Sequence, residues 1–363
     1  MNDQVIMTLD AGGTNFVFSA ICNAAEVVKP VHMSAMGHDL DQCLKNIISG
    51  FEAVKEKLTD PPAAISFAFP GPADYENGII DDLENLPGFR GGVALGPMLE
   101  NHFGLPVFIN NDGDLFVFGE AMHGLLPDLN KRLRDAGSPK QFKNLSGVTL
   151  GTGFGGGFFR NTQLMAGDNG AAGEVWLMQN PLISDSFAEE SISARAIVNE
   201  YASLSGNGGT AMTPADVYLI AKGEKVGNRE AALESFRKFG SALGMVLAEI
   251  STIMDAPVVI GGGLSNAWEL FSAQMFREME GSYTSLNGKK MPRLIMKTFN
   301  LEDPLEFSEF AKGSKKSIHV PFSGETINYD PMKRIGVGLS RLGASKAIAL
   351  GAYAFAINKL AAN

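Results

Sequence analysis

Acidic residues that follow apolar runs are the side chains of this sequence best suited to chemistry. Asp10 ends the run that begins at Val5, and Asp112 follows the apolar segment 106–109 and two asparagines. A carboxylate at a strand end can hold Mg²⁺ directly or through water. It can also take a proton from a substrate hydroxyl. Asp10 is therefore a candidate Mg²⁺ ligand and Asp112 a candidate general base.

Both Asp112 and Glu174 also have plainer interpretations. The segment 110–113 reads Asn-Asn-Asp-Gly, and all three residue types favour turns. The local sequence favours a simple turn, whereas the position of Asp112 between two glycine-rich halves favours a role as general base. Glu174 lies in a loop rich in Gly and Ala. It is either an exposed acid or an acceptor of hydrogen bonds from sugar hydroxyls.

Three glycine clusters follow apolar runs, at residues 10–14, 147–159 and 256–265. The first two are each followed by a second extended run, which predicts a strand, a tight turn and a strand. Backbone N–H groups in such turns form a concavity suited to phosphate. The alternative is that these glycines serve only the turns. Three such turns in one chain favour two similar halves that face a shared nucleotide.

Two other kinds of site are not supported by the sequence. Gly151, Gly153 and Gly156 have the spacing of a dinucleotide fingerprint, which requires a helix next. Phe158 and Phe159 instead continue an extended pattern. The five histidines and two cysteines form no zinc-binding pattern.

Composition limits the class of protein. The chain has 363 residues, of which 45% are hydrophobic and 19% charged, so we expect a large core and two domains. The net charge of −10 argues against nucleic acid as a partner. Two cysteines indicate a reducing compartment. With no basic leader and no apolar stretch long enough for a bilayer, we expect a cytoplasmic protein without a membrane partner.

The remaining pattern predicts alternating strands and helices. Apolar spacing predicts a helix over 39–58 with Asp39 as N-cap, and a long helix over 230–254. Residues 127–145 are interpreted as a solvated insertion, with a small basic patch as the alternative. Residues 281–340 show no clear pattern. An Ala- and Gly-rich helix over 343–360 is suited to close packing. Other expected helices span 98–103, 115–123, 189–201, 213–222 and 264–280.

Together these segments resemble the ROK family of sugar kinases and related proteins, within the actin-like ATPase fold. The matching segments, in the family's order, are Asp10–Thr14, Pro70–Asp74, Asn85–Phe89, Asn111–Asp112 with Gly119–Glu120, Leu150–Gly157, Ala172–Glu174 and Ile260–Gly263. The resemblance implies an α/β, two-domain actin-like ATPase (sugar kinase/ribonuclease H-like) fold with an interdomain cleft. It places the sugar kinase domain at 1–118 plus about 346–363, and the nucleotide-binding domain at 119–345.

The resemblance also implies an activity, ATP-dependent phosphorylation of a hexose or N-acylhexosamine hydroxyl with Mg²⁺, and a homodimer. Asp112 would be the catalytic base and Asp10 the Mg²⁺ ligand. The implied sugar-binding residues are Gly71, Asn85, Asn111, Asp112 and Glu174. The implied nucleotide-binding residues are Gly12, Gly13, Thr14, Thr152, Gly153, Gly155, Gly262 and Gly263.

The sequence departs from the family after Glu174. The family's Glu-x-Gly-His pattern reads Glu-Val-Trp-Leu here, so Leu177 replaces a histidine that touches sugar and zinc. The cysteine-rich zinc loop is replaced by residues 180–187, so we predict no zinc site and an altered sugar pocket. A catalytically weak sugar- or nucleotide-sensing protein is the alternative. A weaker alternative is an actin-like ATPase of another type, such as an acetate kinase. With only four residues before Val5, we expect no helix-turn-helix module ahead of the first strand.

Overall fold

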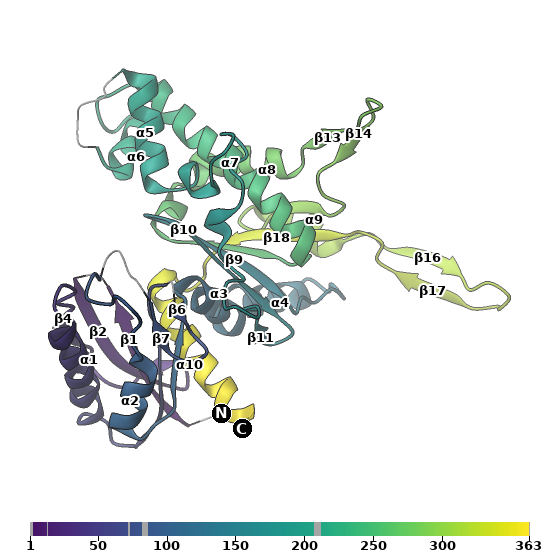
Figure 1. Cartoon of the computed structure of the whole chain (residues 1–363). Helices are drawn as coiled ribbons and strands as arrows, with labels where there is room; N and C mark the ends of the chain where they lie inside the picture. Colours follow the sequence, from purple (N-terminus) through teal and green to yellow (C-terminus); the bar gives the residue numbers. More distant parts are fainter. Residues whose placement is uncertain (1–2, 13, 72, 82–85, 207–211, 363) are drawn as a thin grey trace. The chain divides into compact units, whose positions relative to one another are not determined.

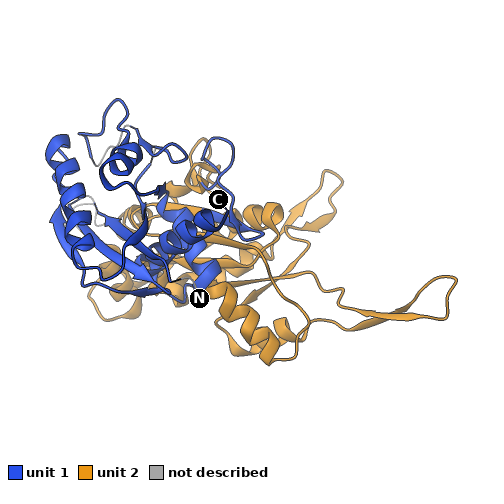
Figure 2. Cartoon of the chain, turned by 90° about the horizontal axis from the view of Figure 1, so that it is seen from below, with its two compact units in different colours: residues 1–124, 157–173, 340–363 blue, residues 125–156, 174–339 orange. Residues whose placement is uncertain are grey.

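The computed structural model describes residues 3–12, 14–71, 73–81, 86–206 and 212–362. The chain divides into two compact units, which Figure 2 colours separately. Unit 1 comprises residues 1–124, 157–173 and 340–363, and unit 2 comprises residues 125–156 and 174–339. Compared with the expected boundaries, residues 119–124, 157–173 and 340–345 also cluster with unit 1.

Unit 1 is built on a six-stranded sheet of order β3-β2-β1-β5-β8, with β4 paired to β2. Its strands are β1 Val5–Ala11, β2 Asn15–Cys22, β3 Ala25–Glu26, β4 Val31–Ser34, β5 Pro62–Ala68 and β8 Val107–Asn110. The first two form the predicted hairpin, and β1, β5 and β8 run parallel. A short hairpin, β6 Ala73–Asp74 with β7 Ile79–Ile80, follows β5.

The helices among the described residues of unit 1 are α1 Leu40–Lys55, α2 Leu95–Phe103, α3 Asp112–His123 and α10 Ala344–Ala362 (Figure 1). The predicted N-cap of α1 is confirmed, because the Asp39 side chain accepts a hydrogen bond from the Gln42 N–H. The core below α1 is aromatic, with the rings of Phe18, Phe51 and Phe67 packed 5.0–5.8 Å apart. This core fixes the strands that end near Asp10 and Asp112.

Helices α3 and α10 pack with their backbones in close approach, as the Ala/Gly-rich pattern predicted. A Cβ at Gly119 would lie 1.9 Å from the Ala347 carbonyl oxygen, and one at Gly351 would lie 1.9 Å from that of Leu115. The fully buried Glu120 of α3 also accepts hydrogen bonds from the Ser340 hydroxyl and the Leu342 N–H, at 2.5 and 3.1 Å. The segment that leads into α10 is thereby tied to α3.

Unit 2 has a sheet in which β9, β12, β18 and β15 run parallel in that order. Their bounds are β9 Leu145–Leu150, β12 Val258–Gly261, β18 Arg334–Leu339 and β15 Lys297–Asn300. From β9 the chain turns into β10 Phe154–Arg160, which confirms the second hairpin and the absence of a dinucleotide helix there. The last residues of β10, and β11 Gln163–Leu164, belong to unit 1.

The helices of unit 2 largely follow the predicted pattern. They are α4 Leu125–Asp135, α5 Ala194–Ser205, α6 Pro214–Lys222, α7 Arg229–Met254, α8 Trp268–Met279 and α9 Pro304–Lys312, with short 3₁₀ turns η1 Val175–Leu177, η2 Ala188–Glu190 and η3 Gly263–Ala267. The interpretation of residues 127–145 as a solvated insertion was wrong for its first part. In α4, four leucines at helical spacing are buried beneath a charged outer face.

The region 281–340, which had no clear pattern, contains two hairpins as well as β15, α9 and β18. The hairpins are β13 Ser282–Thr284 with β14 Lys290–Pro292, and β16 Lys316–His319 with β17 Thr326–Tyr329. Both extend from the body of unit 2 in Figure 1. Over the described part of the chain, no helix is long and apolar enough to span a bilayer.

Candidate functional site

The two candidate acids of unit 1 lie at the same edge of its sheet. Asp10 in β1 is level with Ala68 of β5, and Ala68 is level with Asn110 of β8. The three strands run parallel, so Asp10 and the segment that leads to Asp112 emerge together at their carboxyl ends. Ligands collect at this edge in α/β sheets.

Asp112 is the first residue of α3 rather than a residue of a strand-to-turn segment. The expectation that the helix begins at Leu115 was wrong by three residues. Asn111 is its N-cap, and the Gly113 N–H donates to Asn111 Oδ1 and to Asp112 Oδ1, both at 2.8 Å. A helix N-terminus favours negative charge. The turn-forming residues thus position the acid, so the two interpretations of this segment are compatible.

The carboxyl group of Asp112 has a raised pKa. Solvent reaches the side chain, yet surrounding protein atoms desolvate it, and this desolvation is the main cause. The negative charge of Asp10 adds to the rise, whereas the backbone N–H groups of Asp112 and Gly113 oppose it. A carboxylate with a raised pKa is a stronger base, as a proton acceptor requires.

The first glycine turn lies beside Asp10. The Gly12 N–H donates to the Asn15 carbonyl at 3.1 Å, and the Thr14 carbonyl accepts from the Ala35 N–H at 2.9 Å. A Cβ at Gly12 would lie 2.9 Å from the Asn15 carbonyl oxygen, so the turn requires glycine there. Gly13, also predicted to bind nucleotide, lies outside the described residues.

Gly71 and Asn111, two of the predicted sugar-binding residues of unit 1, lie next to a tyrosine that sequence reasoning missed. The Tyr75 hydroxyl donates to the Phe69 carbonyl at 3.1 Å and accepts from Asn111 Nδ2 at 3.5 Å. A Cβ at Gly71 would lie 2.8 Å from the same hydroxyl. Tyr75 therefore joins the Gly71 loop to the start of α3. Asn85 lies outside the described residues.

In unit 2, the turn between β9 and β10 is held by an acid that sequence reasoning also missed. The Gly151 N–H donates to the Gly153 carbonyl at 3.0 Å, with Thr152 exposed between them. Glu189 Oε2 accepts from the Phe154 N–H at 2.9 Å, and its Oε1 pairs with Arg195 at 3.0 Å. Among the described residues, none accepts a hydrogen bond from the Thr152 or Gly153 N–H group.

The third glycine cluster lies next to this turn. Gly261 of β12 is level with Thr149 of β9, so both strands end at one edge. Gly262 has φ of 87°, and a Cβ there would lie 2.3 Å from the Leu150 carbonyl oxygen. Gly263 begins η3 and has open space above it. Gly155 instead packs against the Thr149 side chain within the hairpin.

Glu174 is the N-cap of the short turn η1 of unit 2, and Leu177 is the last residue of that turn. The Trp176 indole donates to Glu174 Oε2, and both Glu174 and Leu177 are exposed. Of the residues that the structure describes, no three His, Cys, Asp or Glu side chains are grouped to hold a metal. The predicted lack of zinc stays a prediction.

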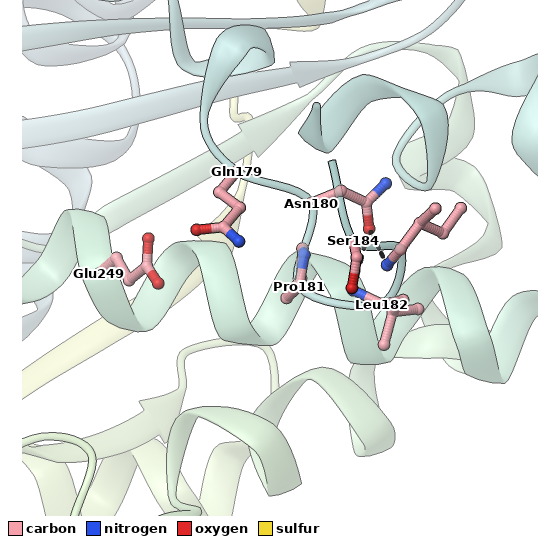
Figure 3. Close-up of a pocket in the computed structure, with 7 residues that line it drawn as sticks. Gln179, Asn180, Pro181, Leu182, Ser184 and Glu249 are labelled. Atoms are coloured by element: carbon pink, nitrogen blue, oxygen red, sulfur yellow. Dashed lines mark hydrogen bonds between the residues drawn. The ribbon is translucent and has the colours of Figure 1, made fainter. Parts of the chain in front are cut away.

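Asn180 organises the loop that replaces the family's cysteine-rich segment (Figure 3). The residue is 2% exposed, and its Oδ1 accepts from the Leu182 and Ile183 N–H groups at 2.9 and 3.1 Å. Its Nδ2 donates to the Phe187 carbonyl at 3.0 Å. One amide side chain thus closes this loop by hydrogen bonds. Gln179, Pro181, Ser184 and Glu249 line the open pocket beside it.

Comparison with known proteins identifies the family. The ROK family model matches residues 6–298. An N-acetyl-D-glucosamine kinase of Vibrio cholerae is 27% identical over 308 residues, which are 79% of this chain and 92% of the relative. The crystal structure of a glucokinase from Parabacteroides distasonis covers 98% of both chains, with 49% identity and a TM-score of 0.90.

A ROK family glucokinase from Streptomyces griseus, solved with glucose and AMPPNP, is 17% identical. It has a TM-score of 0.59 over 96% of this chain and 98% of its own. This similarity supports the fold, and the prediction of a two-domain actin-like ATPase fold is confirmed. Since the family model spans most of the sequence, the chain belongs to the ROK family.

Proposed function

We propose that this ROK sugar kinase transfers the γ-phosphoryl group of ATP to a hydroxyl of a hexose or N-acylhexosamine, with Asp112 as general base. The observation that carries the proposal is the placement of Asp112. The acid has a raised pKa, starts a helix, and shares a strand edge with Asp10. The proteins similar to this chain include an N-acetyl-D-glucosamine kinase and a glucokinase.

The proposed reaction transfers one proton, forms one bond and breaks one bond. As the sugar hydroxyl oxygen bonds to the γ-phosphorus, the Asp112 carboxylate takes the hydroxyl proton. The bond from the γ-phosphorus to the oxygen that it shares with the β-phosphate breaks, and ADP leaves. Positioning and charge neutralisation supply most of the rate in such transfers. The Gly113 N–H bond to Asp112 Oδ1 fixes the carboxylate while its other oxygen accepts the proton.

Asp10 fits the role of Mg²⁺ ligand. Its carboxylate is exposed at the strand edge, and Mg²⁺ prefers a few carboxylate oxygens together with water and substrate phosphates. A dedicated cluster of protein ligands is therefore not needed. When bound, the ion would neutralise charge on the phosphates. Asp10 would orient it beside the Gly12–Thr14 turn.

The glycine turns of both units supply backbone donors for ATP in this proposal. Gly12, Gly13 and Thr14 in unit 1, and Thr152 and Gly153 in unit 2, would bind phosphates. Gly262 and Gly263 would approach the adenosine, since the positive φ of Gly262 and the open space above Gly263 leave backbone accessible there. Gly155 acts within the hairpin.

The sugar would be held by Asn111, Asn85 and Glu174 beside the Gly71 loop. Asn111 Oδ1 is engaged by the helix, so its Nδ2 group would donate to a sugar hydroxyl. Glu174 Oε2 accepts from Trp176, and its Oε1 would accept from the sugar. Leu177 offers neither donor nor acceptor, so the pocket there would favour an apolar substituent.

The test is ADP release with MgATP against a panel of hexoses, hexosamines and N-acylhexosamines. Turnover on one sugar, and its loss in Asp112→Asn with sugar binding retained, is the expected result. Near-normal turnover by Asp112→Asn would remove Asp112 from the base role. Binding of ATP and sugar by the wild-type protein without turnover on any sugar would favour a sensor.

A further inference from the structure

Tyr75 is held in place by the short β6–β7 hairpin of unit 1 (Figure 1). It directly follows β6, and the Asp74 carboxylate fixes the turn by accepting from the Asn77 N–H at 3.1 Å and from Asn77 Nδ2 at 2.8 Å. The hairpin also lies against α2, since a Cβ at Gly78 would lie 2.8 Å from the Gly96 Cα. The Tyr75 ring packs against the hydrophobic core of the unit. The position of its hydroxyl is therefore fixed by the fold.

The Tyr75 hydroxyl takes part in a directed pair of hydrogen bonds. A hydroxyl has one hydrogen to donate and two lone pairs that accept. The Phe69 carbonyl can only accept, so the hydrogen points to it at an oxygen–oxygen distance of 3.1 Å. The hydroxyl oxygen therefore accepts from Asn111 Nδ2, at 3.5 Å. Hydrogen bonds in catalytic sites are often long in the free enzyme and shorten when substrate binds, and we expect this bond to do so.

These bonds fix which end of the Asn111 amide faces the substrate. Asn111 Oδ1 accepts from the Gly113 N–H at 2.8 Å, and that N–H can only donate. Tyr75 requires the amide nitrogen on its own side, so both neighbours select the same orientation of the amide. Among the described residues, none accepts from the second hydrogen of Nδ2. The substrate group that meets this nitrogen must therefore be an acceptor, such as a hydroxyl or carbonyl oxygen.

The Gly71 loop provides independent evidence for the importance of this hydroxyl. Gly71 lacks a positive φ, so its backbone conformation alone would allow alanine. A Cβ at this position would lie 2.8 Å from the Tyr75 hydroxyl oxygen but 3.7 Å from the ring carbon Cζ. The first distance is too short for a real Cβ, and the second is an ordinary van der Waals contact. Glycine at position 71 therefore leaves space for the hydroxyl rather than for the ring.

We propose that Tyr75 is a positioning residue for the sugar, because its hydroxyl orients Asn111 so that the amide nitrogen faces an acceptor oxygen of the substrate. This inference rests on the proposed function, in which Asn111 Nδ2 donates to a sugar hydroxyl. The Gly113 N–H bonds that hold Asn111 and Asp112 are independent of this hydroxyl, so the base keeps its position when the hydroxyl is removed. Tyr75 therefore acts on sugar binding more than on phosphoryl transfer.

The first test removes the hydroxyl alone. Steady-state kinetics of the full chain use MgATP and the sugar with the highest turnover in the panel. In Tyr75→Phe we expect the sugar KM to rise about three- to tenfold, the loss expected for one hydrogen bond, with kcat and the ATP KM changed by less than about twofold. An unchanged sugar KM would overturn the proposal, whatever happens to kcat.

Tyr353→Phe is the matched control for the lost hydroxyl. The Tyr353 hydroxyl accepts from the Asn23 N–H at 3.1 Å, just beyond the end of β2. Because β2 runs antiparallel to β1, that end lies at the edge of the sheet opposite to Asp10. The control therefore removes a tyrosine hydroxyl from the same unit, away from the site, and its sugar KM should equal that of the wild type. An equal rise in both variants would assign the effect to a general loosening of unit 1 and overturn the proposal.

The second test uses the close approach of Gly71. Gly71→Ala pushes the hydroxyl away from Asn111, so by itself it should raise the sugar KM as Tyr75→Phe does. Combined with Tyr75→Phe it should add nothing, because the remaining ring leaves space for the methyl group. Additive rises in the double variant would overturn the coupling of Gly71 to Tyr75.

Failure of this inference is distinguishable from failure of the proposed function. Wild-type protein without turnover on any sugar contradicts the proposed function and, with it, the role of Tyr75 in sugar binding. Normal wild-type turnover with an unchanged sugar KM in Tyr75→Phe contradicts only the role of Tyr75. Melting temperatures test the coupling without turnover, since Gly71→Ala should lower the melting temperature of the wild type and leave that of Tyr75→Phe nearly unchanged. Equal falls in both backgrounds would overturn the coupling.

Discussion

At the scale of single residues, the raised pKa of Asp112 has two measurable effects. A base must be ionised, so turnover falls as the pH falls through the Asp112 pKa, which lies above the ordinary aspartate value of 3.8. In Asp112→Asn we expect kcat to fall by about 10²–10⁴-fold. We also expect the acidic limb of the pH–rate profile of the residual activity to change. A pH–rate profile of unchanged shape would contradict the role of Asp112 as general base.

The same pKa predicts the effect of this substitution on stability. Because the folded-state pKa lies above the unfolded value, the folded protein binds the proton more tightly, and ionisation at neutral pH destabilises the fold. Asp112→Asn should therefore melt at a temperature equal to or above wild type at pH 7. Asp41→Asn, in the first turn of α1, is the control for a lost helix charge.

Glu189 offers a second test at this scale. Its Oε2 accepts from the Phe154 N–H, so Glu189→Ala should loosen the turn and lower kcat/KM for ATP roughly tenfold. The KM for the sugar should stay nearly constant. Glu190 pairs with the same Arg195 at 2.6 Å but accepts no hydrogen bond from the described residues of the turn, so Glu190→Ala is the matched control. Equal losses in both variants would assign the effect to Arg195.

The site was predictable where its residues are consecutive. Asp10 with its glycines, and Asp112 after two asparagines, have local sequence patterns that strand-and-turn rules can interpret. Glu189 and Tyr75 could not be found in this way. Glu189 reaches a backbone N–H that is 35 residues earlier in the chain, and Tyr75 reaches across a loop to Asn111. Such contacts depend on tertiary placement, which spacing does not encode.

At the scale of elements, the contact between α3 and α10 should tolerate no added methyl group. Gly351→Ala places a carbon against the Leu115 carbonyl, so we expect the free energy of unfolding to fall by about 1–3 kcal/mol. Thermal melts against Ser345→Ala, an exposed position on α10, measure the difference. An unchanged melting temperature in Gly351→Ala would show that the helices separate easily. Turnover should fall with stability because α3 begins at Asp112.

Elements with strong periodicity were predictable, and those that depend on packing were not. α1 and α7 were predicted to within a few residues because caps and apolar spacing agree. α4 was missed because the charged residues of its outer face dominate its composition, although its four leucines have helical spacing and are buried. β18 was missed because its six residues follow the exposed β16–β17 hairpin, and a fully buried parallel strand has no alternation.

For the whole molecule, activity should depend on a divalent cation while folding does not. Excess EDTA should abolish ADP release, and added Mg²⁺ should restore it, because the proposed ion is held largely by substrate phosphates and Asp10. Circular dichroism should be unchanged by EDTA alone. Sugar with Mg-AMPPNP should raise the melting temperature by mass action. Loss of structure in EDTA would instead indicate a structural metal.

The position of α10 in the chain affects the order in which unit 1 can fold during synthesis. The ribosome makes α3 early, but the helix that packs against it follows all of unit 2 in the chain. A nascent chain that ends before residue 340 contains Asp10, Asp112 and the glycine turns. It lacks the residues of α10 and of the preceding segment that contact Gly119 and Glu120 in the folded protein. Synthesis must therefore reach α10 before the packing face of α3 is covered, so we expect fragments that end before residue 344 to lack a stable α3.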